Sequence, residues 1–570
     1  MRLPGPLTTR VFSSLDQAAL SPVGGSGGSS QLDALLSLDA SLRALHAGET
    51  RPPSFPFVRQ SQSRLPLTKQ HANVDVAICG GTLGLLLGCA LQLSGHSVGV
   101  IEGGPLRGRE QDWNTSLEEL NALVEQGVLT ESELPRVAPL AFGPMRCAFG
   151  PSPSHQLSLH GVLDIAVSPS ELLRIVRARF EAAGGVVMER TRVAGVTIHT
   201  DGARLCLGEG AEGGMGVHCQ LVVDCMGHAS PIARQQRFAR GQRPDGVCIQ
   251  VGSCSSYAGW GERWGSSADF FTTESDATPG GPNGKARVQY FWQAFPTSGE
   301  DEDERSTYMF TYLKPDREMP SLLEAMEEYW TRLPAYQGNR LKRPDDPLEE
   351  INVRRVLFGW FPTYRRDSPL PPHFDRVLSI GDASAVQSPI SFGGFCAMLR
   401  HLPRLRRGLD LALRSDSLRS SDLACLAPYL PNLGTAWMSA SAMTARVVET
   451  PAEPSKLVNR LLEGNFKVMD TWMPRSQAVT FFRDVTTLET LSIVLVAQTA
   501  TMAPLLPSVV AEIGALELLE FGYHYVMLVL YTVLFAIADT RGALTLDEPT
   551  KEAFRRSCRL DAWRYGSGLD

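Results

Sequence analysis

A glycine-rich turn stands between a predicted strand and a predicted helix near residue 80. The sequence V-D-V-A-I-C-G-G-T-L-G over residues 74–84 ends an apolar run with Gly80, Gly81, Thr82 and Gly84, and an apolar helix pattern follows. Glycine lets the backbone approach a phosphate closely, and the amides of a helix start attract negative charge. Cys79 occupies the first position of the G-x-G-x-x-G fingerprint, so plain packing is an alternative reading of the turn alone.

An acidic residue follows at the distance that a dinucleotide site requires. Residues 97–101 form a second apolar run, and Glu102 closes it. A carboxylate about 20 residues after the glycines can accept hydrogen bonds from both hydroxyls of a ribose. It also disfavours NADP, because the carboxylate would repel the 2′-phosphate. Strand, glycine turn, helix, strand and acid together predict a Rossmann-like nucleotide site.

Two remote segments favour FAD over NAD. In L-V-V-D-C-M-G-H-A-S-P-I-A-R (residues 221–234), an apolar run ends at Asp224 and Gly227 follows. In V-L-S-I-G-D-A-S-A-V-Q-S-P-I-S-F-G-G-F (residues 377–395), a second run ends and a helix start follows; the residues concerned are Gly381, Asp382, Pro389, Gly393 and Gly394. FAD is long, so its ribitol and ring must be held by chain far from the first turn, and a helix start can stabilise a reduced, anionic flavin ring.

Composition excludes several other classes of protein. The chain has 570 residues, 43% of them hydrophobic and 20% charged, with a net charge of -7. No concentrated basic face is expected, so nucleic acid is not an expected partner. The 11 cysteines form no C-x-x-C pair, so we expect neither a structural metal site nor a disulfide framework.

The predicted fold is α/β: a Rossmann-like FAD-binding domain of the flavin hydroxylase and lycopene cyclase type, an antiparallel-sheet substrate domain and a helical C-terminal region. The predicted ranges are a transit or disordered segment (1–30), a helix and linker (31–70), the first part of the FAD domain (71–245), the substrate sheet (246–350), the last part of the FAD domain (351–410) and the helical region (411–570). The first segment is rich in Ser, Gly and Pro, and its charged residues are Arg2, Arg10 and Asp16. Low acid content together with Ser and Arg is typical of an organelle transit peptide; a disordered tail is the alternative.

The C-terminal region contains two uncharged runs. Residues 491–511 reach the length needed to span a bilayer, but they contain two prolines, a glutamine and several threonines. The second run, residues 526–538, is too short to span. We therefore predict helices that dip into one leaflet. The alternative is a buried helical cap.

Several stretches resemble the CruA/CruP-type lycopene cyclase family of FAD-dependent carotenoid enzymes, which also includes the green-algal violaxanthin de-epoxidase. They are G-R-E-Q-x-W-N (residues 108–114), Y-M-F-T-Y-L-K-P-D (308–316), F-P-T-Y-R-R-D-S-P-L-P (361–371), G-D-A-S-A-V-Q-S-P-I-S-F-G-G-F (381–395) and L-A-P-Y-L-P-N-L (426–433). The resemblance covers about residues 30–540. The strand at residues 310–313 has no carboxylate, whereas plant-type cyclases carry a paired-Glu motif on the matching strand.

The resemblance implies a hydrophobic carotenoid substrate, a membrane surface, an electron donor for the flavin, and a place in the chloroplast, at the stromal face of the thylakoid or in the envelope. It implies that Glu102 binds the adenosine ribose, that Asp382 contacts the ribitol or pyrophosphate, and that Gly393 and Gly394 lie by the isoalloxazine. Arg109 would also reach the cofactor.

The reaction is left open by the sequence. Cyclisation of a polyene end is redox-neutral and needs an acid and a base, whereas removal of an epoxide is a two-electron reduction. Tyr312 and Asp316 are candidates for proton transfer, with a strand tyrosine and a turn aspartate as the ordinary readings. A lycopene cyclase-like activity is the first hypothesis and a violaxanthin de-epoxidase is the second. A geranylgeranyl reductase, a monooxygenase or a non-catalytic lipid-binding relative are further alternatives.

Overall fold

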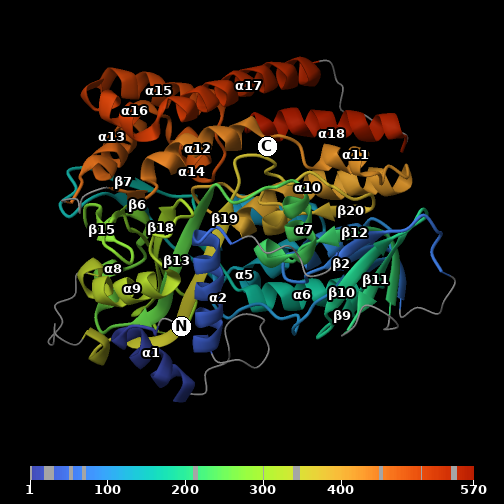
Figure 1. Ribbon diagram of the computed structural model, residues 1–570, viewed down its shortest axis with the longest axis horizontal. Coiled ribbons are helices and arrows are strands. Elements are labelled where there is room, and N and C mark those ends of the chain that lie inside the picture. The colour runs from blue at the N-terminus through green and yellow to red at the C-terminus, as the bar shows by residue number, and fades with distance from the viewer. Residues whose placement is uncertain are drawn as a thin grey trace.

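Two large sheets and a C-terminal group of helices form most of the described part of the protein (Figure 1). The computed structural model describes residues 3–17, 31–49, 56–66, 72–208, 216–299, 301–337, 347–448, 454–501, 503–540 and 549–569. In Figure 1 the first sheet lies at the right, the second at the left, and the C-terminal helices along the top. The predicted α/β class, with an antiparallel second domain and a helical C-terminal region, is confirmed.

The first sheet has the strand order β1-β10-β11-β12-β2-β3-β9, and β20 also pairs with β12. Its parallel core is β2 (Ala72–Cys79), β3 (Val98–Ile101), β9 (Val186–Met188), β12 (Gly216–Asp224) and β20 (Val377–Ser379). The antiparallel pair β10 (Val193–Ile198) and β11 (Ala203–Leu207) extends it, and β1 (Val58–Gln60) forms the edge. The strand β1 belongs to this sheet although the sequence analysis assigned its residues to a linker.

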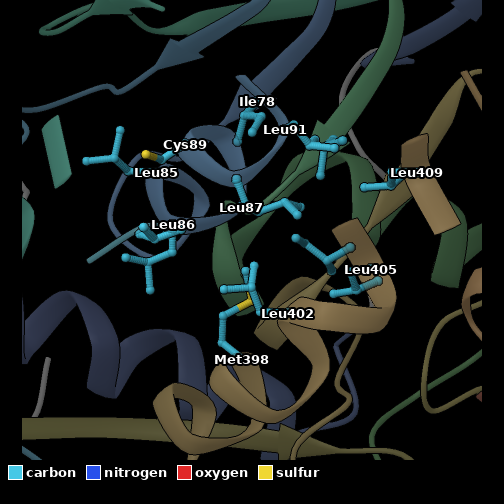
Figure 2. Packing of buried hydrophobic residues seen from close by; sticks show 14 of the residues in the cluster. Ile78, Leu85, Leu86, Leu87, Cys89, Leu91, Met398, Leu402, Leu405 and Leu409 are labelled. Atoms are coloured by element: carbon cyan, nitrogen blue, oxygen red, sulfur yellow. The ribbon is translucent and has the colours of Figure 1, made fainter. Parts of the chain in front are cut away.

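Helix packing against this sheet brings remote segments together. Helix α3 (Gly84–Leu93) is buried from Gly84 to Leu91 because it lies between the sheet and two other helices, α6 (Pro169–Ala182) and α10 (Gly394–Arg414). Figure 2 shows leucines of α3 facing Met398, Leu402, Leu405 and Leu409 of α10. Each buried leucine contributes about 1.5–3 kcal/mol. This contact fixes the start of α10 beside the glycine turn.

The second sheet has the order β19-β13-β18-β17-β14-β6-β7. Its strands are β6 (Met145–Ala148), β7 (Gln156–Leu159), β13 (Gly246–Ser256), β14 (Ala268–Thr272), β17 (Phe291–Pro296), β18 (Glu304–Leu313) and β19 (Asn352–Thr363). The predicted range 246–350 is therefore too narrow. Two strands come from inside the first FAD range and one from the last, because β6 pairs with β14 and β19 pairs with β13 along its whole length.

The N-terminal helices pack on one face of the second sheet. Helix α1 (Pro6–Gln17) buries Val11, Phe12 and Leu15 in the same core as α2 (Gln31–His46) and α9 (Leu322–Tyr336). Glu327 of α9 accepts hydrogen bonds from the first amides of α1. The disordered-tail reading of residues 1–30 is therefore wrong for residues 6–17, since apolar burial holds them; residues 18–30 lie outside the described residues. The transit-peptide reading stays a prediction.

The C-terminal region is helical, as predicted. It contains α11 (Ser420–Leu423), α12 (Pro431–Met443), α13 (Leu457–Trp472), α14 (Arg475–Phe482), α15 (Leu488–Thr501), α16 (Leu506–Ile513), α17 (Ala515–Thr540) and α18 (Lys551–Gly566). The uncharged run at 526–538 lies inside α17, which has 26 residues and is the one described helix that is long and apolar enough to cross a membrane by length and composition. The uncharged run alone is too short to span, but the helix begins before the run and is longer than the sequence analysis expected. Helices α15 and α16 form a bent pair, with 85° between them, that passes the same test together.

Shorter elements complete the chain. The helices are α4 (Leu117–Glu125), α5 (Leu134–Val137), α7 (Pro231–Ala239) and α8 (Trp260–Trp264), and the 3-10 turns are η1 (Glu131–Glu133), η2 (Gly227–Ala229), η3 (Pro347–Glu349), η4 (Gly381–Ala383), η5 (Ala424–Leu426) and η6 (Ala503–Leu505). Two small sheets are β4 (Trp113–Thr115), β8 (Ile165–Val167) and β5 (Leu140–Ala141), and β15 (Thr278–Gly280), β16 (Ala286–Val288) and β21 (Arg446–Val447).

Candidate flavin site and adjoining cavity

The turn after β2 needs its glycines for close approach. Gly80 has a φ of +96°, and a Cβ there would lie 2.4 Å from the carbonyl oxygen of Cys225. A Cβ on Gly84 would lie 2.7 Å from the side chain of Ile78. The turn is therefore pressed between β2, the end of β12 and the start of α3. Its open side forms part of a cleft lined by Gly80, Thr82 and Gly84.

Glu102 lies at the end of β3, next to the turn. Its Oε2 accepts a hydrogen bond of 2.7 Å from the Gly81 amide, and its Oε1 accepts one of 3.1 Å from the Gly104 amide. Glu102 also lines the cleft. Gly81 itself lies behind the carboxylate and does not line the cleft. The two amides orient Glu102, and its remaining lone pairs can accept hydrogen bonds from ribose hydroxyls.

Asp224 has a structural position and not the predicted cofactor-binding one. Its carboxylate is fully buried and accepts hydrogen bonds from the Ser230 hydroxyl at 2.6 Å, the Ser379 hydroxyl at 3.0 Å and the Met226 amide at 3.1 Å. Burial raises the pKa of Asp224 to about 6. These bonds join the end of β12 to β20 and to the start of α7. Gly227, three residues on, does line the cleft.

The start of α10 faces the other end of the cleft. The helix begins at Gly394, and Gly393 precedes it. A Cβ on Gly394 would lie 2.7 Å from Oδ1 of Asp382, so the helix start and this carboxylate are in close contact. Asp382 belongs to the turn η4, whose first residue, Gly381, has a φ of +56°. A helix start at this place can stabilise negative charge on a ligand.

The three predicted segments meet at one cleft of about 990 Å³. The predicted cofactor residues that line it are Gly80, Thr82, Gly84, Glu102, Arg109, Gly227, Gly381, Asp382, Gly393 and Gly394. Pro389 does not line this cleft; it lines a neighbouring cavity with the loop 362–369 and α12. Pro389 is close to Gly393 and Gly394 in sequence, but it faces the neighbouring cavity and so does not belong to the site.

A buried polar atom beside the cleft is placed where a bound ligand could pair with it. Among the described residues, the Nδ2 of Asn114 is buried and has no hydrogen-bond partner. Asn114 lines the cleft together with Trp113, and the Arg109 guanidinium lies 6.0 Å from the Trp113 ring centroid. An unpaired buried amide is costly, and a bound ligand with acceptor oxygens would satisfy it. The open cleft, the carboxylate and the helix start together fit a dinucleotide with a ring at the α10 end.

A second, apolar cavity of about 320 Å³ adjoins the cleft at the start of α10. Its walls are the inner face of the second sheet and helices α12 to α17, with side chains that include Phe271, Phe310, Leu462, Met469 and Phe521. Gln250, Phe270, Gln293, Ser391, Phe392, Phe482 and Asp484 line both spaces. The apolar cavity therefore adjoins the cleft close to Gly393.

The two predicted proton-transfer residues do not line the cleft or the apolar cavity. Tyr312 is buried, and its hydroxyl donates a hydrogen bond of 2.5 Å to the carbonyl of Ile390. Burial raises the pKa of Tyr312 far above its ordinary value. Asp316 is exposed in a turn, where it accepts a hydrogen bond of 2.9 Å from the Glu318 amide. Both predictions were wrong because the strand ends before Asp316 and Tyr312 lies beneath the loop that carries Ile390.

Sequence reasoning missed two residues at the site. Tyr308, on the same face of β18 as Tyr312, lines the cleft, and burial raises the pKa of its phenol. Asp484, which follows α14, lines both the cleft and the apolar cavity. A period-two reading of β18 could have included Tyr308. Nothing in the sequence around Asp484 distinguishes it from a surface aspartate.

Comparison with known proteins finds likeness in fold alone. No protein-family model and no curated protein matches the sequence. A geranylgeranyl bacteriochlorophyll reductase-like protein from Thermoplasma acidophilum aligns with a TM-score of 0.55 at 13% identity, covering 77% of this chain and 98% of that chain. A variant of the halogenase PltM in complex with FAD aligns with a TM-score of 0.51 at 12% identity, covering 85% of this chain and 99% of that chain.

The fold and the cleft define the class of protein. The chain shares its fold with the reductase-like protein and with the halogenase, and it has the parallel-cored first sheet, the mostly antiparallel second sheet and the helical C-terminal region that the sequence predicts. The segments that the sequence analysis assigned to FAD meet at one cleft. The apolar cavity at its far end is the feature that bears on the substrate.

Proposed function

We propose that this protein is an FAD-dependent carotenoid-modifying enzyme that acts on the end group of a polyene, with lycopene cyclase-like activity. The observation that carries the proposal is the apolar cavity that adjoins the cleft close to Gly393 and Gly394. A long hydrocarbon needs an apolar, water-poor channel, and its reacting end must reach the flavin ring. The resemblance of residues 108–114, 361–371 and 381–395 to CruA/CruP-type proteins supports a carotenoid as that hydrocarbon.

The residues of the cleft assign a position to each part of FAD. Glu102 would bind the adenosine ribose, and the turn at Gly80 would lie against the pyrophosphate. Asp382 would contact the ribitol, and the start of α10 would face the flavin ring. In its reduced, anionic form FAD supplies negative charge beside a carbocation, or electrons to an epoxide. An electron donor for the flavin is part of this proposal.

Two alternative reactions would use the same cavity. A de-epoxidase of the green-algal type would remove an epoxide from a xanthophyll with two electrons, and the family resemblance includes such an enzyme. A polyprenyl reductase would saturate double bonds of a chain of similar shape, and the fold neighbour from Thermoplasma is described as geranylgeranyl reductase-like. The product distinguishes the three: a ring, an alkene from an epoxide, or a saturated bond.

Product analysis tests the reaction. Purified protein carrying reduced FAD is incubated with lycopene in lipid vesicles and, separately, with violaxanthin, and the pigments are separated by chromatography. Conversion of lycopene to a cyclic product is the expected result. Conversion of violaxanthin alone would replace the cyclase with a de-epoxidase, and no conversion of either pigment by flavin-loaded protein would contradict the proposed substrate class.

The proposal includes a membrane surface, which α17 would contact. The outer face of α17 exposes Leu516, Leu519, Tyr523, Val526, Leu530, Val533 and Ile537, at alternating spacings of three and four residues. Leu516 is 82% exposed and Leu519 is 72% exposed. The inner face packs on α12 and α18, with His524 and Leu528 buried. Because one face is held by protein along its length, we propose that α17 lies in one leaflet and does not span the bilayer.

Residues of α17 and of the neighbouring α16 line the apolar cavity, which favours a lipid bilayer as the partner of the exposed face of α17. Val509, Val510 and Ile513 of α16 and Leu518 and Phe521 of α17 line the cavity. A hydrocarbon could pass from the leaflet between these helices without crossing water. By the family resemblance, we propose the stromal face of the thylakoid, or the envelope, as the membrane.

Acidic substitutions on the outer face of α17 test membrane docking. The triple variant Leu519→Glu, Val526→Glu and Val533→Glu places three charges where the lipid would be, so we expect vesicle association to fall by roughly tenfold or more. The flavin content should not change, because all three side chains are exposed. Flotation of purified protein with lipid vesicles measures the association.

A matched control uses exposed apolar residues of the nucleotide domain. Leu93→Glu, Leu117→Glu and Phe238→Glu change three side chains that are 45%, 51% and 47% exposed. This variant should float with vesicles as the unchanged protein does. Equal loss of flotation in both variants, or unchanged protein that never floats, would count against docking through α17.

A further inference from the structure

Asp484 lies where the flavin cleft and the apolar cavity meet. Among the described residues that line both spaces, it alone has an ionisable side chain. Its neighbours there are apolar or uncharged, such as Phe392, Phe482 and Gln293. A group at this junction would face the end of a hydrocarbon held in the cavity and the ring of a cofactor held in the cleft.

The backbone holds Asp484 in a position that normally favours glycine. Asp484 has a φ of +63° directly after helix α14 and its C-cap Arg483. The Asp484 amide donates to the carbonyl of Phe481 at 3.1 Å, and the Val485 amide donates to the carbonyl of Thr480 at 3.2 Å. This is the hydrogen-bond pattern of a Schellman helix end, in which the left-handed residue is usually glycine. The chain thus has a carboxylate where glycine would cost least.

Two serines connect Asp484 to the start of α10. The side chains of Ser388 and Ser391 lie beside the Asp484 carboxylate and favour its charged form. The Ser391 oxygen also accepts a hydrogen bond of 3.1 Å from the Gly393 amide, and the Ser388 oxygen accepts one of 3.2 Å from the Ile390 amide. Asp484 therefore lies next to the loop that leads into α10, at the end of the cleft assigned to the flavin ring.

Burial favours the protonated form of Asp484 over its charged form. Arg400 of α10 and Glu119 of α4 face it, and their side chains form an ion pair with an Nε to Oε1 distance of 3.9 Å. Tyr312 and Cys396 are the other titratable groups that interact electrostatically with Asp484. Burial raises the pKa of Asp484 although Arg400 and the two serines act to lower it. A carboxyl group with a raised pKa can act as an acid near neutral pH.

We propose that Asp484 is the acid that protonates the end of the substrate at this junction. The inference rests on the proposed cyclase function. The O–H bond of the carboxyl breaks, and its proton forms a C–H bond at the terminal double bond of the polyene. The resulting cation closes the ring by forming a C–C bond, and the carboxylate then takes the proton that the adjacent ring carbon loses. The proton is returned, and no electrons enter or leave.

Three variants test this role. Asp484→Asn keeps the size and the tolerance for a positive φ but removes the acid, so turnover of lycopene should fall by roughly 100-fold or more. FAD content and quenching of flavin fluorescence by bound lycopene should stay unchanged. Asp484→Glu should recover part of the activity. Asp410→Asn is the control, because Asp410 pairs with His96 and Arg414 far along α10 from its start.

The pH profile supplies a readout that a structural role would not change. Turnover should fall as pH rises through the raised pKa of Asp484, because the protonated form is the active one, and Asp484→Glu should shift this limb. Full turnover by flavin-loaded Asp484→Asn would overturn the proposal.

An infrared measurement separates failure of this proposal from failure of the proposed function. If flavin-loaded protein converts no lycopene, the substrate class fails, and the acid is then tested without substrate. The carboxylic acid C=O band at neutral pH should be weaker in Asp484→Asn than in the unchanged protein. Identical spectra would overturn the assignment of Asp484 as a protonated acid.

Discussion

Gly80→Ala is expected to yield protein without bound FAD and with reduced stability. The left-handed φ of +96° costs an alanine about 1–3 kcal/mol. The new Cβ would in addition lie 2.4 Å from the carbonyl oxygen of Cys225, so the turn or the end of β12 must move. Both lie beside the cleft. Bound FAD is measured by the absorbance of the purified protein between 350 and 500 nm, where flavin absorbs, and we expect a near-complete loss of this signal. Thermal unfolding measures stability.

Gly95→Ala separates the steric effect from the backbone effect. Gly95 lies in the loop between α3 and β3 and has a φ of +95°, but nothing lies within 4 Å of a Cβ there. This variant should lose about 1 kcal/mol of stability and keep its flavin. If Gly80→Ala bound as much FAD as Gly95→Ala, the glycine turn would not be the pyrophosphate site.

Ala442→Trp is expected to abolish activity on a long polyene while FAD remains bound. Ala442 of α12 lines the apolar cavity but not the cleft. An indole there would fill part of a space of about 320 Å³ and displace the substrate end, and misplacement of a reacting group costs roughly 100-fold in rate. Lycopene turnover should show this loss. Bleaching of the flavin by dithionite and its reoxidation by oxygen should be unchanged.

Two controls accompany this substitution. Ala239→Trp introduces the same side chain at an exposed position at the end of α7 and should leave turnover unchanged. Ala442→Val adds less volume and should give an intermediate loss. Full turnover of lycopene by Ala442→Trp would show that the polyene does not use the apolar cavity.

Local sequence predicts the nucleotide half well because each element there follows from neighbouring residues. The strand before Gly80, the turn, the helix after Gly84 and the carboxylate of Glu102 all lie within 31 residues, from Ala72 to Glu102. Strand and helix periods, together with glycine chemistry, define such a unit. The start of α10 was also predicted, since Gly393 and Gly394 follow a strand and precede an apolar helix pattern.

Positions that depend on tertiary contacts could not be predicted. An aspartate at the end of a strand can face a cleft or bond inward, and Asp224 bonds inward because Ser230 and Ser379 are placed around it by other segments. The length of α17 depends on its acidic first turns, where Glu517 and Glu520 pair with Arg365 at 2.8 and 2.9 Å. The ion pair with Arg365, which lies 152 positions before Glu517, thus allows α17 to begin before its uncharged run.

The predicted boundaries of the substrate sheet were wrong for the same reason. Strand β6 joins the second sheet through β14, which comes more than 100 residues later, and β19 joins through β13. The sequence of a short strand does not show which sheet the strand joins. Asp484 was missed because only the meeting of α14, the loop 388–393 and α10 gives it a place at the site.

The flavin content of the purified full-length chain is the most direct test of the central claim, which is that three remote segments bind one FAD at the cleft. The absorption spectrum is recorded before and after dithionite, and the released flavin is identified by chromatography after denaturation. One FAD per chain, bleached on reduction, is the predicted result. A folded, colourless protein whose spectrum and thermal unfolding do not change with excess FAD would contradict it.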